Sequence, residues 1–257
     1  MLSYNQVKTH GGESMANSIP QHFDEAFLRW FQERTELAWQ SYQTRTFEDF
    51  VASGVGGRDW QQGTCWSGGL SEQEIVAVEQ RFHTHFPPDY RLFLQQLHSV
   101  DRLLVGARYA DDNTMIPITA PSFYHWQRDT EAIEAAYAWL VKGLYFDVQH
   151  ANLWPQSWGA KPASAEAQEA RVRELVSAAP KLIPILGHRY LLAEPCKAGN
   201  PVLSIYQSDM VVYGDNLHNF FLKEFGGLFG VKSFEIPRLA LVDFSAYELI
   251  PFWGEFL

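Results

Sequence analysis

The sequence predicts an α+β fold, because the patterns typical of strands and of helices occupy separate stretches and do not strictly alternate. Between residues 182 and 213, short apolar stretches are separated by turn residues such as Gly187-His188 and Ser208-Asp209, as in an antiparallel meander. The predicted strands are 182–185, 190–192, 201–206 and 210–213. Apolar residues at helical spacing predict helices over 129–148 and 164–179.

The composition suits a folded core and a soluble chain. Of the 257 residues, 46% are hydrophobic and 15% aromatic, and the length fits one large domain or two small ones. The net charge of −10 disfavours direct binding to nucleic acid or to an anionic membrane and would attract a basic partner, although solubility alone is the simpler explanation. We expect no signal peptide, no membrane helix, no disulfide framework and a cytoplasmic location.

The N-terminal part lies ahead of the most regular stretch of the sequence. Residues 1–20 are polar and aperiodic, which predicts a flexible arm. Residues 23–42 carry one apolar helical face, which Phe47 and Phe50 extend. The Gly-rich residues 54–69 predict a loop or linker.

Later segments add a hairpin and a closing helix. Residues 103–105 and 115–118 predict short strands with a turn at 111–113 between them. Asp215 is expected to cap a Phe-rich helix that ends at Gly226-Gly227. The apolar tail is expected to add an edge strand or to cover the sheet.

Residues 70–97 are the most informative stretch. Ser71 followed by Glu74 predicts a capping box, and Leu70 with Ile75 predicts a hydrophobic staple at the start of a helix. Pro87-Pro88 ends that helix and starts a second one.

This stretch resembles the SUKH superfamily, the Smi/Knr-like domains. The residues that carry the resemblance are Leu70, Ser71, Glu74, Ile75, Glu79, Phe86, Pro87, Asp89, Tyr90, Phe93 and Leu94. Pro184-Ile185, Tyr190-Leu191 and the Phe-rich closing helix are similar to the second half of the family pattern. One departure is residues 98–101, which replace the family's Asn-Gly-Gly turn.

The resemblance implies one antiparallel sheet with helices packed on one face. It divides the chain into an arm (1–20), an N-terminal helix and Gly-rich loop (21–69), a SUKH-like domain (70–230) and a C-terminal extension (231–257). It also implies a function: SUKH-like bacterial proteins are typically immunity proteins that bind and neutralise toxins, many of them nucleases. The superfamily also contains regulatory and scaffold proteins, and that role is the first alternative.

The sequence offers no convincing catalytic constellation, so we expect a non-enzymatic protein without a cofactor or a metal ion. Residues 83–85 (His-Thr-His) lack further zinc ligands nearby in the sequence, and solvated histidines are the simpler interpretation. Cys196 with His188 or His218 is a weak nucleophile and base pair, because an isolated cysteine is usually buried and inert. A small hydrolase with a hidden site remains the second alternative.

Some residues suit protein binding. The candidates are Asp111, Asp112, Glu131, Glu134, Trp154 and Trp158. Carboxylates beside large aromatic anchors would suit a basic, nucleic-acid-binding protein such as a toxin domain. The simpler alternatives are that the carboxylates form a solvated surface and that the tryptophans fold back over the sheet.

Overall fold

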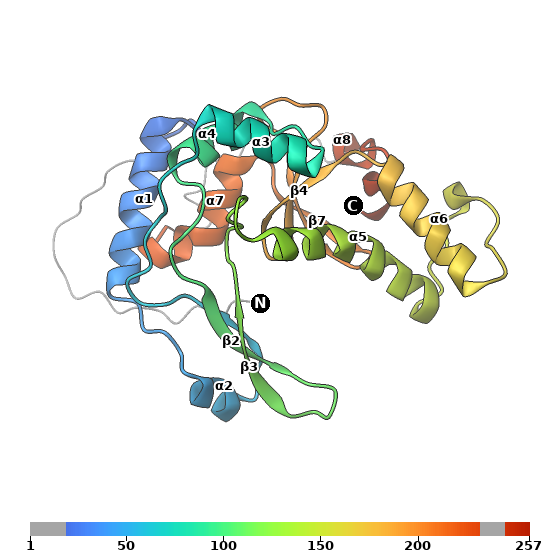
Figure 1. Ribbon diagram of the computed structural model, residues 1–257, viewed down its shortest axis with the longest axis horizontal. Coiled ribbons are helices and arrows are strands. Elements are labelled where there is room, and N and C mark those ends of the chain that lie inside the picture. The colour runs from blue at the N-terminus through green and yellow to red at the C-terminus, as the bar shows by residue number, and fades with distance from the viewer. Residues whose placement is uncertain (1–18, 232–244) are drawn as a thin grey trace.

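The structure is a computed structural model that describes residues 19–231 and 245–257. It confirms the α+β class, with helices around two antiparallel sheets (Figure 1). The expectation of a single sheet is only partly right. The meander forms one sheet of four strands, while the hairpin predicted around 111–113 belongs to a second sheet of three strands.

The four-stranded sheet has the order β4-β5-β6-β7, every pair antiparallel. Its strands are β4 (Leu182–Leu186), β5 (Arg189–Leu192), β6 (Val202–Tyr206) and β7 (Asp209–Gly214). The expected coverage of one face only is wrong, because neighbouring residues of β5 point to opposite faces and meet different helices. The Tyr190 hydroxyl donates to the Ala136 carbonyl of α5 (Thr130–His150), while Arg189 faces Glu224 of α7 (Leu217–Phe225).

The three-stranded sheet has the order β1-β2-β3, with β1 (Gly57–Asp59), β2 (Leu104–Tyr109) and β3 (Met115–Ala120). β1 lies within the stretch predicted to be only a loop. Gly106 of β2 is required there, since a Cβ atom at this position would lie 2.0 Å from the carbonyl oxygen of Gly57. The β2–β3 hairpin extends away from the rest of the molecule (Figure 1).

The N-terminal helix is an integral part of the core. α1 (Glu25–Gln40) buries Phe27 and Phe31, and the Phe31 ring centroid lies 4.8 Å from that of Phe221 in α7. The predicted extension of this helix is wrong: α2 (Phe47–Ser53) is a separate helix that begins with its own capping box at Thr46. Gly54 ends α2 in the left-handed conformation, at φ 63°.

The other helices agree with the sequence. They are α3 (Glu72–Phe82), α4 (Pro88–Gln96), α5, α6 (Ala165–Ala178) and α7. The 3-10 turn η1 (Gln156–Trp158) forms where no helix was predicted. Asn216 caps α7 in place of the expected Asp215. None of the described helices is both long and apolar enough to cross a membrane.

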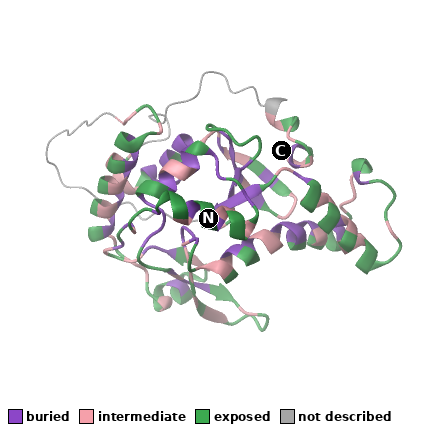
Figure 2. Ribbon diagram, turned by 45° about the horizontal axis from the view of Figure 1, so that its top comes forward, coloured by how far each residue is buried: buried purple, intermediate pink, exposed green. Residues whose placement is uncertain are grey.

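The chain ends in short turns. η2 (Gly226–Phe229) follows α7, and α8 (Ser245–Glu248) and η4 (Trp253–Phe256) close the C-terminus. The Trp253 indole N–H donates to the Pro180 carbonyl just before β4, so the tail covers one end of the sheet. The expected arm and residues 232–244 of the tail lie outside the described residues, apart from the last two positions of the arm. Figure 2 shows that buried residues gather in the four-stranded sheet and in the helix faces turned toward it, whereas β3 of the other sheet has no buried residue.

Candidate functional site

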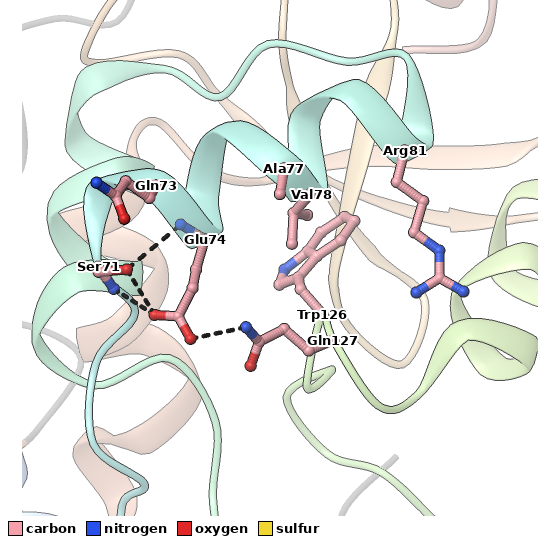
Figure 3. Close-up of a pocket in the computed structure, with 8 residues that line it drawn as sticks. All are labelled: Ser71, Gln73, Glu74, Ala77, Val78, Arg81, Trp126 and Gln127. Carbon is pink, nitrogen blue, oxygen red and sulfur yellow. Dashed lines mark hydrogen bonds between the residues drawn. The ribbon is translucent and has the colours of Figure 1, made fainter.

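The capping box forms as the sequence predicts and also holds a neighbouring loop. Glu74 accepts hydrogen bonds from the backbone N–H and the hydroxyl of Ser71, and from the side-chain amide of Gln127 (Figure 3). The hydrogen bonds from Gln127 and Ser71 lower the pKa of Glu74 to about 2. Helix α3 is therefore tied to the loop between β3 and α5.

The same loop is anchored more deeply by Trp126. Its backbone N–H donates to Nε2 of His98 over 3.1 Å, and its indole N–H donates to the Tyr90 hydroxyl over 2.9 Å. Burial, with a smaller contribution from His125, lowers the pKa of His98 to about 4, so the ring is neutral and can accept this bond at neutral pH. Trp126 is thus a core residue supplied by a loop.

A cavity of about 300 Å³ lies between α3 and this loop (Figure 3). Its apolar lining includes Val78 and Trp126, which are only 4% and 0% exposed. Glu74 already holds three hydrogen bonds there, and Arg81 points out at the opposite end. Because Val78 and Trp126 are almost inaccessible, a ligand would contact mainly the residues around the opening of the cavity. The cavity is therefore poorly suited to enclose a small molecule.

Two other residues of the stretch 70–97 join separate segments of the chain. Glu79 accepts a hydrogen bond of 2.7 Å from the Phe86 N–H and pairs with the Arg91 guanidinium over 2.6 Å. Asp89 accepts a hydrogen bond of 2.8 Å from the Gly199 N–H, in the connection between β5 and β6. Glu79 and Asp89, two of the residues that carry the resemblance, thus have structural roles in this chain.

No described residues form a recognisable metal site, since no group of three or more His, Cys, Asp or Glu side chains is placed to hold an ion among them. His83 caps α3 in the left-handed conformation, at φ 49°. Cys65 and Cys196 are free and exposed.

The predicted tryptophan pair is brought together, but one member is buried. The ring centroids of Trp154 and Trp158 lie 5.3 Å apart. Trp158 is 2% exposed and stacks on Phe252 of the tail at 6.0 Å, so it cannot offer its face to a partner in this conformation. Trp154 is half-buried, and its indole N–H donates to the Gly159 carbonyl.

The predicted carboxylates do not form one site. Asp111 and Asp112 are exposed at the tip of the β2–β3 hairpin, and Glu131 and Glu134 are exposed on the first turns of α5. The loop after α5, which carries the predicted Trp154 and Trp158, lies at a different end of the molecule from the hairpin tip with Asp111 and Asp112 (Figure 1). Asp112 is used locally, because it accepts hydrogen bonds from the N–H and the hydroxyl of Thr114.

The structure adds a surface that the sequence analysis missed, which we call the aromatic ridge: Trp139, Phe146 and His150 on α5, and Tyr206 at the end of β6. The Trp139 and Tyr206 ring centroids lie 5.8 Å apart, and Phe146 stacks on His150 at 4.2 Å. Tyr206 is 58% exposed and Phe146 is 47% exposed. A signal existed in the sequence, since Trp139 and Phe146 fall outside the apolar stripe of residues 133–144 that faces the core.

Comparison with protein-family models, curated proteins and solved structures gave no match to this chain.

Proposed function

We propose that this chain is a non-enzymatic protein-binding module of the immunity type, which binds a toxin domain in the cytoplasm and neutralises it. The observation that carries the protein-binding part is the aromatic ridge. Trp and Tyr side chains are costly to expose and are enriched among the anchors of protein interfaces. Here Trp139 lies on the same helix as Glu131 and Glu134 and contacts Tyr206 at the end of β6, in a protein with a net charge of −10.

The resemblance of residues 70–94 to the SUKH superfamily supports the toxin-binding form of the proposal. In this chain the capping box of Ser71 and Glu74, the bridging carboxylates Glu79 and Asp89, and the buried aromatic Tyr90 all have defined structural partners. A pattern that stabilises a scaffold leaves the outer faces of that scaffold to determine the partner.

The mechanism we propose is occlusion. An acidic surface with aromatic anchors would cover the basic surface with which a nuclease toxin holds its substrate. Complementary charge would speed the encounter, and buried aromatic contacts would slow dissociation.

The experiment is capture of the tagged chain from its native cells, followed by a neutralisation assay. We expect recovery of one large secreted or surface protein through its C-terminal domain. Expression of that domain alone should stop the growth of a host, and co-expression of this chain should restore it. A catalytically inactive toxin domain, which should still bind, is the control for expression burden.

Two outcomes would contradict the proposal. Recovery of kinases or cytoskeletal proteins would favour a regulatory or scaffold protein. If nothing binds in cells that express toxins, and the purified protein hydrolyses a panel of ester, phosphodiester and glycoside substrates, an enzyme is the better description.

A further inference from the structure

We infer that residues 251–257 are an internal ligand of the loop after α5, and that a partner segment with aromatic side chains on both sides of a carboxylate displaces them. The face that they cover belongs to Trp158, one of the two tryptophans predicted to anchor a partner. The inference goes beyond the proposed function, because this face is separate from the aromatic ridge and its ligand need not be a toxin.

The C-terminal residues contact the loop through their side chains, as a bound peptide would. Phe252 stacks on Trp158 with the ring centroids 6.0 Å apart, and Phe256 meets the same ring edge-on at 6.3 Å. Glu255 lies between them in the sequence and accepts a hydrogen bond of 2.7 Å from the Ser157 hydroxyl. The chemistry of the displacing segment follows from these contacts, which come from two aromatic rings that flank a carboxylate.

Two cations contact the tryptophans of this loop. The Lys161 ammonium lies 5.8 Å from the centre of the Trp154 ring, and Nε of Arg171 donates to the Trp158 carbonyl over 3.3 Å. Arg171 is already paired with Glu174, whereas Lys161 forms no ion pair with any residue that the structure describes. A carboxylate therefore suits this face better than a cationic side chain does.

The contact has two energetic costs, which make it easier to open. Phe252 has φ 66° and ψ −57°, and the Trp253 N–H donates to the Pro251 carbonyl over 2.8 Å, so Phe252 is the central residue of a rare and strained γ-turn. The indole N–H of Trp158 is buried without a hydrogen-bond partner among the described residues. Withdrawal of the Phe252 ring relaxes the turn and lets water reach this N–H, so both costs favour the open state.

Trp253 keeps the segment attached when the other rings withdraw. Its side chain is 1% exposed, and its indole N–H donates to the Pro180 carbonyl over 2.7 Å. Gly254 follows it and gives the last three residues the freedom to turn away. The segment can therefore return when a partner dissociates, and in this way it regulates access to Trp158.

The test measures the binding of a dye-labelled peptide of residues 250–257 to the full chain by fluorescence anisotropy. In the open variant, Phe252→Ala with Phe256→Ala, the chain's own segment no longer covers Trp158. We expect the peptide to bind this variant about tenfold more tightly than the unsubstituted chain. Leu249→Ala, at a residue that is 80% exposed, is the matched control and should keep the weak affinity.

Two further changes show whether the peptide uses the same face and the same chemistry. Trp158→Ala, added to the open variant, should abolish binding. A peptide that carries Glu255→Lys should bind the open variant about fivefold more weakly than the unsubstituted peptide. Circular dichroism of every variant checks the fold. Equal affinity of the open variant and the unsubstituted chain, or of the two peptides, would overturn the inference.

A measurement on the unsubstituted chain does not depend on the fold of any variant. The indole N–H of Trp158 should exchange with deuterium faster than that of Trp126, which is also buried and is bonded to the Tyr90 hydroxyl. Equal rates would mean that the segment opens only when the whole chain unfolds, and the inference would be wrong. It would also be wrong if the chain forms a dimer that the open variant abolishes, because the segment would then be exchanged between copies.

Discussion

The carboxylate of Asp89 accepts a hydrogen bond from the backbone N–H of Gly199 across 110 positions of the sequence. A second carboxylate oxygen accepts the Tyr90 N–H at the start of α4. The side chain is buried, and that burial raises the pKa of Asp89 even though both hydrogen bonds favour its ionised form. This residue therefore joins the first helical pair to the β5–β6 connection of the meander.

Replacing Asp89 should destabilise the fold. Asp89→Ala leaves the N–H of Gly199 without its acceptor, and we expect the free energy of unfolding to fall by about 2 kcal/mol. Urea denaturation measures this, and the slope of the transition should not change. Asp112→Ala is the matched control, since Asp112 also accepts two hydrogen bonds but in an exposed turn. Equal losses in the two variants would mean that the Asp89 link adds nothing beyond local bonding.

Acid should weaken the fold through His98. The pKa of His98 is about 4 in the folded chain and 6.5 as its ordinary value, so the unfolded chain binds the proton more readily. The contribution of neutral His98 to the free energy of unfolding is fully present above pH 6.5. It is lost as the pH falls toward 4, by about 3 kcal/mol in total. Arg128 and His125 add to this effect, whereas Asp129 and Glu74 oppose it.

Unfolding by urea at a series of pH values measures how the free energy of unfolding changes with pH. His98→Gln, which retains an acceptor, should flatten the fall between pH 6.5 and 4. His125→Gln should remove a smaller part, because His125 is only half-buried. If His98→Gln leaves the pH profile unchanged, the hydrogen bond to Trp126 is not sensitive to this proton.

Two adjacent glycines should differ sharply in their tolerance of alanine. A Cβ atom at Gly69 would lie 1.8 Å from the carbonyl oxygen of Gln95, whereas one at Gly68 would meet nothing within 4 Å. Gly69→Ala must displace the chain next to the hydrogen bond between Leu70 N–H and the Leu94 carbonyl, and we expect a loss of about 3 kcal/mol. Thermal denaturation should show Gly68→Ala close to the unsubstituted chain. A tolerated Gly69→Ala would contradict this close approach of α4.

Alanine substitutions of the two tryptophans in the loop after α5 should also differ in their effect on stability. Trp158→Ala opens a cavity against Phe252, and the expected loss is about 4 kcal/mol. Trp154→Ala should cost about 1 kcal/mol, since the side chain is only half-buried. Thermal denaturation distinguishes them. Similar losses would indicate that Trp158 is not held by the tail as described.

Much of the fold could be predicted because its signals are local. The capping box of Ser71 and Glu74 and the apolar stripe of α5 depend on near neighbours in the sequence, and both form as expected. β1 could not be predicted, since three residues that begin with glycine show no strand pattern, and β1 forms only because β2 offers it a partner. That long-range pairing adds a third strand to the local hairpin of β2 and β3.

The surface residues were harder to predict for the same reason. Exposure of Trp139 and burial of Trp158 depend on the β6–β7 turn and on the C-terminal tail, which are distant in the sequence. The sequence located aromatic residues in a loop but could not indicate which of them a remote segment would cover. Asp111 and Glu131 were grouped by charge alone, and the hairpin holds them on separate elements.

The contact between Phe31 and Phe221 has an evolutionary consequence. A relative that kept residues 70–230 but lacked α1 would expose the ring of Phe221, so it would need a different apolar cover at this point of α7. Substitutions in α1 and α7 should therefore be correlated among homologues, large side chains on one helix accompanying small ones on the other. We therefore expect α1 and α7 to be inherited together.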